Sequence, residues 1–344
     1  MERQQNNPLV SIIITSYNRA NLIEQAIDSA LAQDYQNLEI IISDNNSTDN
    51  TDEVIKKYLA DPRVKYFKNI ANLEMAGNFR IATEERAKGE FLTYISSDDY
   101  LINEHFITKA ITIINNYENV LLVFGKNMTL LEKHNILLDD KTHRLYKNEF
   151  REGKNVFLKF ANIKAMGWGG TLINRKELEA LNIFNSKTTS LDYETNLLLM
   201  LRGNVGFIKA PTYVFRIHSG QASQNHLKTT ESLLQNYSFI FESYKYAREN
   251  KIFSEKRLEK WMNDLLFLEA RYVTLRFLSV NKKEYNKLMT YFRSNHSKVY
   301  KRLKRNIKHN FLSLLYRRPN LYLKFIKIIS KGHYRNLKNI LSEA

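Results

Sequence analysis

The sequence of 344 residues contains no cysteine, which excludes disulfide frameworks, zinc sites built on thiolates and cysteine nucleophiles. The absence also suits a reducing compartment. No stretch of about 18 uncharged apolar residues occurs, so we expect no segment that spans a bilayer. The chain reaches an apolar run at Leu9 without a basic leader and a cleavable apolar core, and we therefore expect no secretory signal.

Glycine and proline are scarce, with 11 and 4 residues, and they thin out further toward the C-terminus. After Gly220 only Pro319 and Gly332 remain, and the pattern beyond residue 226 is helical with no clear strand. We expect two regions, residues 1–225 and residues 226–344. The chain has no internal repeat and no low-complexity segment.

Acidic residues are also scarce in one part of the chain. The whole sequence carries 52 Lys and Arg against 36 Asp and Glu, a net charge of +16, and residues 241–344 hold 25 against 8. The protein is therefore a near-neutral body with a basic C-terminal region. Such asymmetry indicates an anionic partner for that region, without distinguishing nucleic acid, lipid and charged glycan.

The first half of the chain alternates between strand and helix patterns. Short apolar runs predict strands at residues 9–15, 38–43, 64–67, 91–95 and 120–124, and helical patterns occupy residues 21–32 and 51–59. Further strands are expected near 127–131, 169–174 and 205–217, and further helices near 154–161 and 192–202. Alternation of this kind predicts an α/β fold with an open, parallel sheet made of right-handed crossovers.

Polar loops follow three of these strands, and ligands bind at the carboxyl ends of such strands. The loops are residues 15–19 (TSYNR), residues 44–49 (DNNSTD) and residues 96–99 (SSDD). Two adjacent carboxylates repel each other unless a cation lies beside them, and oxygen ligands suit Mg²⁺ or Mn²⁺. A single Asp-Asp pair is more often a turn or a helix cap, but three such loops on one sheet edge favour a site.

The order of these motifs resembles that of a known family. The run VSIIITSYNRANLIEQAIDSALAQDYQNLEIIISDNNSTDNT, followed by KGEFLTYISSDDY, is similar to the family 2 glycosyltransferases of GT-A fold, bacterial enzymes that build surface polysaccharides. The resemblance covers roughly residues 8–220 and leaves the rest uncovered. It implies a GT-A nucleotide-sugar-binding fold with a mostly parallel central sheet, followed here by a helical, basic C-terminal region.

The resemblance implies donor-binding roles for the first two loops. Thr15, Tyr17 and Asn18 would lie by the nucleobase, with Tyr17 stacking on it, although an aromatic residue in a turn is the alternative. Asp44 and Asn45 match the family's Asp-Asp pair that hydrogen-bonds the base. The second member is an amide here, which can both donate and accept.

The family also has an Asn-rich segment before the fourth strand. Asn72 and Asn78 match it, and Gly77 replaces the Arg that usually precedes the second Asn. Arg80 is a candidate substitute for that Arg on the donor side. A solvated position on a helix is the alternative for Arg80.

The resemblance places a metal site at the third loop. Asp98 and Asp99 match the family's Asp-x-Asp motif, with Ser96 where many members carry the first acid. Asp98 would reach the ribose or the metal, and Asp99 would hold Mn²⁺ or Mg²⁺. His218, in an Arg-x-His sequence near the end of the catalytic domain, is a further metal candidate or a structural histidine. The metal would neutralise the leaving diphosphate as a Lewis acid.

Transfer to a hydroxyl needs a group that removes the acceptor's proton. Asp192 matches the family's base, and Leu191 replaces the acid that usually precedes it. We expect the carboxylate to stay ionised because the first turn of a helix is the positive end of its dipole. Glu194 is the second candidate, and a simple helix cap is the structural alternative for Asp192.

A glycine-dense segment precedes the strand near residues 169–174. Gly169 and Gly170 would allow close approach of the backbone to a ligand, and Trp168 could stack on a sugar. These three residues are assigned to the acceptor and sugar side. A bulge with a core tryptophan is the alternative.

The basic C-terminal region contains amphipathic patterns. Leu321, Phe325, Ile328 and Ile329 share one side of a helical pattern with lysines on the other, and Lys301–Arg305 form a basic cluster. Such helices lie on anionic membrane surfaces, although solvated faces of a helical bundle fit equally. No motif supports nucleic-acid binding.

Together these features predict an inverting, metal-dependent hexosyltransferase or N-acetylhexosaminyltransferase. Its donor would be a nucleotide sugar, with UDP as the default, and its acceptor a glycan or a lipid-linked glycan. The Gln-x-x-Arg-Trp signature of processive synthases in this family is missing, so we expect a non-processive enzyme that adds one or a few sugars per encounter. The expected location is cytoplasmic, at the inner face of the cell membrane. A sugar nucleotidyltransferase would need a glycine-rich loop after the first strand, which TSYNRA does not provide. A degenerate nucleotide-binding module that binds a membrane or nucleic acid is the remaining alternative.

Overall fold

The computed structural model of the protein describes residues 6–139, 146–160, 167–218 and 229–305. Its chain forms two compact units, of which the first comprises residues 1–224 and 241–252, and the second residues 225–240 and 253–344. The expected regions 1–225 and 226–344 differ from these units, because residues 241–252 belong to the first unit. Helix α9 (Ser238–Glu249) begins in the second unit and ends in the first.

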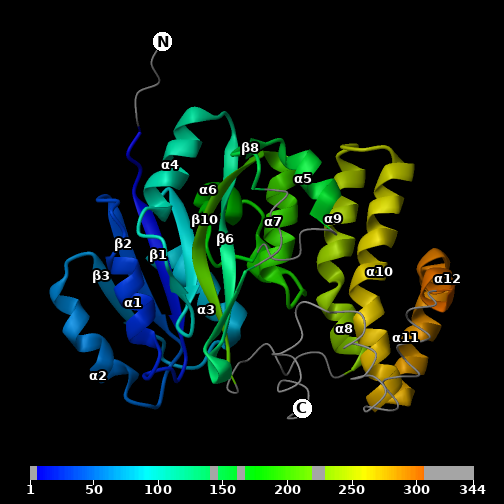
Figure 1. Ribbon diagram of the computed structural model, residues 1–344, viewed down its shortest axis with the longest axis horizontal. Helices are drawn as coiled ribbons and strands as arrows, with labels where there is room; N and C mark the ends of the chain where they lie inside the picture. Colours follow the sequence, from blue (N-terminus) through cyan, green and yellow to red (C-terminus); the bar gives the residue numbers. More distant parts are fainter. Residues whose placement is uncertain (1–5, 140–145, 161–166, 219–228, 306–344) are drawn as a thin grey trace. The chain divides into compact units, whose positions relative to one another are not determined.

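The first unit is built on one ten-stranded sheet with the order β3-β2-β1-β4-β9-β6-β10-β5 (Figure 1), in which β7 pairs with β6 and β8 with β10. Its strands are β1 (Val10–Ser16), β2 (Leu38–Asp44), β3 (Val64–Lys68), β4 (Phe91–Ser96), β5 (Tyr100–Leu101), β6 (Val120–Leu131), β7 (Ile136–Asp139), β8 (Phe150–Arg151), β9 (Thr171–Asn174) and β10 (Asn204–Ile217).

The sheet is mostly parallel, as the sequence predicts. Strands β3, β2, β1 and β4 run parallel to one another, and β6 runs parallel to β10. Strand β9 lies between β4 and β6 and is antiparallel to both. The two strands expected at 120–124 and 127–131 are one strand, β6. Gly125 lies within this strand. A Cβ at this position would lie 2.5 Å from Thr212 of β10, so the close contact between the two strands requires a glycine here.

Helices α1 (Ile23–Leu31), α2 (Thr51–Lys56) and α4 (Phe106–Asn116) bury apolar side chains in one core with the sheet. Within it, α4 packs against β6 and β10. Helix α4 was not predicted from the sequence, although Phe106, Ile107, Ala110 and Ile111 are buried at helical spacing. Helix α3 was not predicted either. The remaining helices of the first unit are α3 (Glu74–Ile81), continued by a π-helical turn (Ala82–Arg86), α5 (Gly153–Lys159), α6 (Arg175–Glu179) and α7 (Leu191–Arg202).

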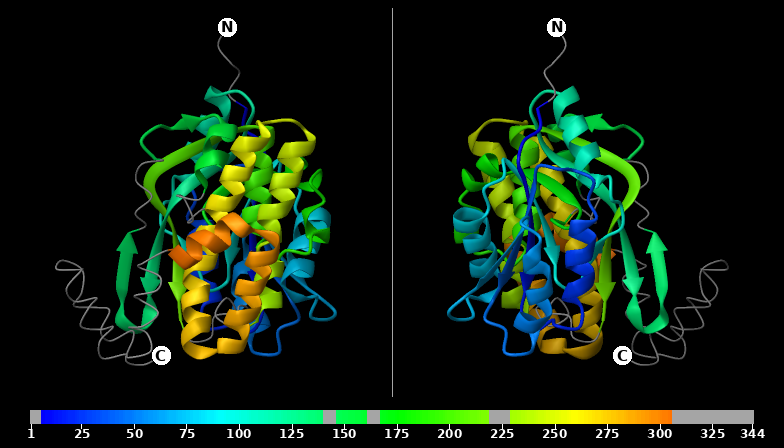
Figure 2. Two further views of the ribbon diagram at one scale, coloured as in Figure 1. Left: turned by 90° about the vertical axis from the view of Figure 1, so that its right-hand side faces the viewer. Right: turned by 90° about the vertical axis from the view of Figure 1, so that its left-hand side faces the viewer.

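The second unit is helical, in agreement with the sequence. It contains α8 (Thr230–Asn236), α10 (Glu255–Val280), α11 (Lys282–Asn295) and α12 (Ser297–Arg305). Figure 2 shows α10 and α11 side by side with α12 packed on them. The basic cluster Lys301–Arg305 lies on α12, and the amphipathic pattern at 321–331 lies outside the described residues. No helix among the described residues is long and apolar enough to cross a membrane.

Candidate functional site

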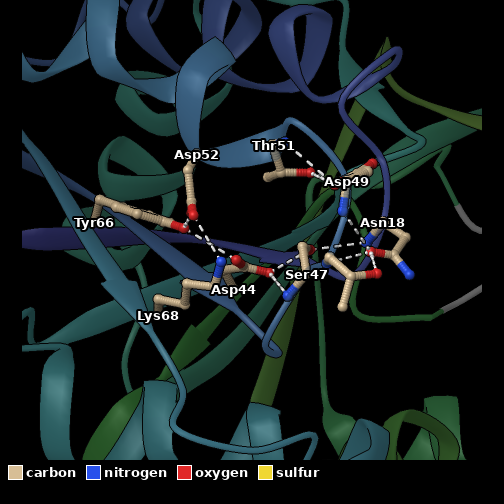
Figure 3. A network of polar contacts seen from close by, with 9 residues as sticks. Asn18, Asp44, Ser47, Asp49, Thr51, Asp52, Tyr66 and Lys68 are labelled. Atoms are coloured by element: carbon tan, nitrogen blue, oxygen red, sulfur yellow. Dashed lines mark hydrogen bonds and ion pairs between the residues drawn. The ribbon is translucent and has the colours of Figure 1, made fainter.

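Asn18 joins the loops that follow β1 and β2 (Figure 3). Its Oδ1 accepts hydrogen bonds from the backbone N–H groups of Thr48, at 2.8 Å, and Asp49, at 3.4 Å, and its own N–H donates to Ser47 Oγ at 2.8 Å. Asn18 adopts a left-handed conformation with φ of 52°, which asparagine tolerates better than most residues. The junction fixes the loop that presents Tyr17, whose side chain is exposed.

Asp44, at the end of β2, is fully buried and surrounded by donors (Figure 3). Its Oδ1 accepts from the N–H and hydroxyl of Ser47, at 3.1 and 2.5 Å, and its Oδ2 from the Tyr66 hydroxyl at 3.0 Å. Tyr66 also contacts Asp52, and Lys68 donates to Asp52 at 2.6 Å. Although burial opposes it, hydrogen bonds from Lys68 and Tyr66 lower the pKa of Asp52. The hydrogen bonds of this network therefore favour the ionised form of Asp52.

Asn45 clamps the segment that follows β3. Its Oδ1 accepts from Asn69 Nδ2 at 3.1 Å and from the N–H of Leu73 at 2.9 Å. Its Nδ2 donates to Asn72 Oδ1 at 2.8 Å and to the carbonyl of Glu74 at 3.1 Å. An aspartate could make only the first two of these bonds, because a carboxylate has no donor. The departure from the family's Asp-Asp pair therefore has a structural reason.

The three residues of the next segment that were expected on the donor side have different surroundings. Asn72 accepts from the Asn45 amide, as above, whereas Asn78 is buried and bonds Ser43 through both its amide oxygen and nitrogen, at 2.6 and 3.0 Å. Arg80 lies 3.5 Å from Glu84 and 3.7 Å from Glu85 along its own helix. This geometry matches the alternative of a solvated helical residue.

The cation of this polar cluster is Arg86, which the sequence analysis missed. Its guanidinium donates to Ser43 Oγ at 2.6 Å and to Asn69 Oδ1, and it lies 5.1 Å from the centre of the Phe67 ring. The π-helical turn that ends at Arg86 supplies one residue more than an α-helical turn and so sets where this side chain emerges.

Asp98 and Asp99 have different surroundings although they are neighbours in the chain. Asp99 is buried, with Oδ2 accepting from the Tyr213 hydroxyl at 2.6 Å and Oδ1 from the N–H of Arg216 at 2.7 Å. Burial and the charge of Asp98 raise the pKa of Asp99 to about 7. Asp98 Oδ2 instead lies 3.0 Å from His218 Nε2 and 3.8 Å from the guanidinium of Arg19.

Arg216 organises this end of the site. Its Nε donates to the carbonyl of Asp98 at 2.8 Å, one terminal nitrogen contacts Glu132 at 2.9 Å, and the other contacts Gln25. The side chain is 8% exposed. The sequence identified only its motif partner His218 as a site residue, although a buried arginine beside two acids is a common anchor for a loop.

The donor set fits a divalent metal at Asp98 and His218. A carboxylate oxygen and an imidazole nitrogen that face each other are ligands that Mn²⁺ accepts readily and Mg²⁺ less so. Both oxygens of Asp99 already accept hydrogen bonds, so Asp99 fits the expected metal role less well than Asp98 does. The described residues contain no group of three His, Asp or Glu side chains that could hold a metal ion.

A cavity of about 470 Å³ lies beside the Asp98–Asp99 loop. Asp99 and Ser96 border it on one side and Asp192 on α7 on another. Most of its wall is aromatic or apolar and consists of Met75, Phe79, Tyr94, Trp168, Leu191, Tyr193, Tyr213 and Phe215. One cavity thus brings the third loop of the sequence prediction together with the expected base.

Trp168 forms part of the cavity wall, but it does not project freely into it. Its ring stacks on Tyr94 with 4.6 Å between centroids, meets Phe79 edge-on at 5.1 Å, and is 6% exposed. Gly169 borders the cavity as well, and Gly169 and Gly170 both lie against Tyr213. A Cβ at these positions would lie 2.3 and 2.7 Å from atoms of Tyr213, so both glycines make room for the tyrosine that holds Asp99.

Asp192 lines the cavity from the first turn of α7. Its Oδ1 accepts from the N–H of Tyr193 at 2.9 Å, and a Cβ on Gly167 would lie 3.0 Å from Oδ2. Burial raises the pKa of Asp192 to about 6. Burial therefore outweighs the positive end of the helix dipole in setting this pKa. A group with a pKa of about 6 is still mostly ionised at neutral pH, as a base must be.

Glu194 lies elsewhere. Two residues along a helix rotate a side chain by roughly 200°, and Glu194 does not border the cavity. It is buried, accepts a hydrogen bond from Ser186 Oγ at 2.9 Å, and has a pKa raised to about 7 by burial. This placement does not support the expected position of Glu194 on the acceptor side.

Comparisons with known proteins agree on one family. The sequence profile described as Glycosyl transferase family 2 matches residues 11–181. An uncharacterized glycosyltransferase from Rickettsia typhi is 27% identical over 275 residues, 77% of this chain and 81% of the relative. A UDP-Glc:alpha-D-GlcNAc-diphosphoundecaprenol beta-1,3-glucosyltransferase from Escherichia coli is 30% identical over 224 residues, 64% of this chain and 82% of the relative. The fold is similar to the crystal structure of S. aureus TarS 1–349 in complex with UDP-GlcNAc, with a TM-score of 0.67 and 16% identity over 95% of this chain and 93% of that one.

Proposed function

The chain belongs to glycosyltransferase family 2, and from this premise we propose that it transfers a sugar from a UDP-sugar to a hydroxyl group of a lipid-linked glycan, with inversion at the anomeric carbon. The observation that carries the proposal is that Asp99 of the Asp98–Asp99 loop and Asp192 border the same cavity. A base and a diphosphate-binding loop at one cavity are what an in-line displacement requires.

The donor side of the proposal rests on the loops after β1 and β2. Tyr17 is exposed beside the fixed junction at Asn18 and would stack on the base, while Thr15, Asp44 and Asn45 would line the base pocket. Uridine diphosphate is the proposed carrier because the E. coli relative is named for UDP-Glc and the TarS structure for UDP-GlcNAc. The names of two relatives also support the acceptor, since both contain undecaprenol.

The proposed reaction uses the raised proton affinity of Asp192. Its carboxylate takes the proton of the acceptor hydroxyl while the hydroxyl oxygen forms a bond to the anomeric carbon. The bond from that carbon to the donor diphosphate breaks at the same time, and the diphosphate leaves with the electron pair. Because oxygen attacks from the face opposite the leaving group, the anomeric configuration inverts.

The leaving group is assigned to the Asp98–Asp99 loop. Asp98 and His218 would hold Mn²⁺ or Mg²⁺, which when bound would neutralise charge on the diphosphate. Asp99, held by Tyr213 and Arg216, would keep the loop in place. Trp168 would form one wall against the sugars.

The second unit is proposed to bring the enzyme to the membrane that carries its acceptor. Helix α12 buries Val299 and Leu303 and exposes several cations, a pattern suited to an anionic lipid surface. The enzyme would act as a peripheral protein on the cytoplasmic face.

The test is a transfer assay with purified full-length protein. We would offer UDP-Glc, UDP-GlcNAc and UDP-Gal, with and without Mn²⁺, to N-acetylglucosamine-diphosphate-undecaprenol, and read the product anomer by NMR. We expect one donor to react, with inversion and with loss of turnover on chelation of the metal. Retention of configuration, or binding of UDP-sugars without transfer or hydrolysis by any of them, would overturn the proposal.

A further inference from the structure

The segment between β3 and the first turn of α3, residues Ile70–Met75, exposes apolar side chains to solvent. We call it the mouth loop. Ile70 is 102% exposed, Leu73 38% and Met75 54%, and every residue of the loop is exposed. Glu74 is its single charged residue. Isolated exposed apolar side chains are common, but three within six residues form a patch that suggests a binding surface.

The mouth loop is held in shape by hydrogen bonds rather than by packing of its apolar side chains. Asn45 bonds the backbone of Leu73 and Glu74 and the side chain of Asn72. Asn72 Oδ1 also accepts from the N–H of Glu74 at 2.8 Å, and Glu74 adopts a positive φ of 59°. The chain thus maintains a constrained backbone that leaves Ile70 in water, which costs free energy unless the side chain is covered in the working state.

One end of the mouth loop borders the reaction cavity. The loop follows the carboxyl end of β3, and Met75 borders the same cavity as Asp192. Phe215 of β10, 37% exposed, borders that cavity too. Two partly exposed apolar side chains, from separate parts of the chain, therefore lie where the cavity wall reaches solvent.

We propose that the mouth loop inserts Ile70, Leu73 and Met75 into the surface of the bilayer that carries the acceptor. The inference rests on the proposed function, because only a lipid-linked acceptor requires the contact. A sugar joined to a lipid by a diphosphate leaves few bonds between the reacting hydroxyl and the hydrocarbon. When that hydroxyl reaches Asp192, the cavity opening must lie at the membrane surface. Aliphatic side chains there enter the boundary between head groups and acyl chains.

Membrane binding through the inserted side chains and membrane binding through the basic helices should depend differently on salt concentration. Attraction of Lys and Arg to anionic lipid is screened by salt, whereas burial of aliphatic side chains is not. A zwitterionic membrane at high ionic strength therefore isolates the contribution of the mouth loop.

The experiment is sedimentation of the full-length protein with vesicles that contain no acceptor. Vesicles of phosphatidylcholine in high salt and of phosphatidylethanolamine with phosphatidylglycerol in low salt would be compared. Ile70→Ser and Met75→Ser are the test variants. Leu59→Ser is the matched control, because Leu59 is 45% exposed but precedes β3 and so lies at the opposite end of the strand.

We expect Ile70→Ser to weaken partitioning onto phosphatidylcholine vesicles by about tenfold, from the loss of one buried aliphatic side chain, with a smaller loss for Met75→Ser. Leu59→Ser should bind as the wild type does. Wild-type binding by Ile70→Ser, an equal loss for Leu59→Ser, or a change in oligomeric state of Ile70→Ser would overturn the inference. The last result would assign the loop to contact with another protein chain.

A lipid-free acceptor separates this inference from the function on which it rests. With a water-soluble N-acetylglucosamine glycoside, Ile70→Ser should transfer at the wild-type rate, and with the acceptor in vesicles its KM should rise about tenfold with kcat unchanged. If the wild type transfers to neither acceptor, the proposed function fails. If it transfers to both and Ile70→Ser is unaffected with vesicles, the mouth-loop inference alone fails.

Discussion

Asp44 and Asp52, in the polar network after β2, lie in surroundings opposite to those of Asp192 on α7. Asp44 accepts three hydrogen bonds from Ser47 and Tyr66, and nearby hydrogen bonds lower the pKa of Asp52 against the effect of burial. Asp192 accepts a bond from the N–H of Tyr193, faces an aromatic cavity, and has a pKa raised to about 6. Donors keep a carboxylate ionised for binding, whereas apolar burial brings its proton affinity near the working pH.

The sharpest test of this contrast is the pair Asp192→Asn and Glu194→Gln. Loss of a general base typically lowers the rate by about 10²–10⁴-fold, and we expect kcat of Asp192→Asn to fall by about 10³ with little change in UDP-sugar affinity. Glu194→Gln, two residues away on another side of the helix, should lose less than about tenfold. Steady-state transfer and calorimetric binding measure both.

The wild-type pH profile belongs to the same test. Because the base acts in its deprotonated form, kcat should rise as the pH passes through about 6, the pKa of Asp192. Equal losses for the two variants, or a flat profile between pH 5 and pH 7, would show that Asp192 is not the base.

A second test addresses the contact between Tyr213 and the glycine pair. A methyl group at position 169 would lie 2.3 Å from the Tyr213 ring, so Gly169→Ala should displace the ring and with it the support of Asp99. We expect about a 10–100-fold loss of transfer and about 1–3 kcal/mol less free energy of unfolding. Tyr213→Phe, which keeps the ring and removes the hydroxyl, should lose activity with a smaller loss of stability. Unchanged activity of Gly169→Ala would refute this role for the glycine.

A third test restores the family's acid at position 45. Asn45→Asp removes two donated hydrogen bonds and leaves the carbonyl of Glu74 facing a carboxylate. We expect the free energy of unfolding to fall by about 1–3 kcal/mol. Asn50→Asp, at the N-terminus of α2, should change it by less than about 0.5 kcal/mol. Urea denaturation measures both, and a stabilised Asn45→Asp would contradict the clamp.

The smallest expected effect is a gain in stability when the base is removed. The pKa of Asp192 is higher in the folded state, about 6, than its ordinary value of 3.8. Between these values the folded protein binds the extra proton, so this group lowers the free energy of unfolding as the pH rises. Asp192→Asn should therefore be more stable by about 1–2 kcal/mol at pH 7.5, and the gain should shrink toward pH 4. Thermal unfolding at both pH values checks it.

The sequence predicted the parts of this molecule that are continuous in the chain. Strands β1 to β4 are apolar runs bounded by polar loops, so their hydrophobic pattern and their ends can both be read from the sequence. The Asp98–Asp99 pair and Asp192 were likewise recognisable, because each belongs to a short motif. The GT-A fold followed from the order of those motifs.

The contacts that hold the motifs were not predictable, because they join distant residues. Tyr213 and Arg216 reach Asp99 across more than a hundred positions. No local pattern marks Tyr213, and the Arg-x-His sequence that contains Arg216 does not say which acid the arginine supports. The cation of the polar cluster around Ser43 is Arg86 and not the expected Arg80. The π-helical turn that ends at Arg86 sets the position from which its side chain reaches Ser43. The sequence shows only that Asn45 stands where the family has an acid. The four groups that its amide bonds, which come from the segment after β3, are visible only in the structure.

The positions of Asp98 and Asp99 have a consequence for how this motif can vary. The two residues lie in the turn after β4, where the N–H of Asp99 donates to the carbonyl of Ser96 at 2.9 Å. One carboxylate points to the buried Tyr213 and the other to His218. The two carboxylates therefore face different partners on different sides of the loop. An exchange of one acid for a neutral side chain cannot be compensated by its neighbour, since rescue would require the peptide between them to turn over.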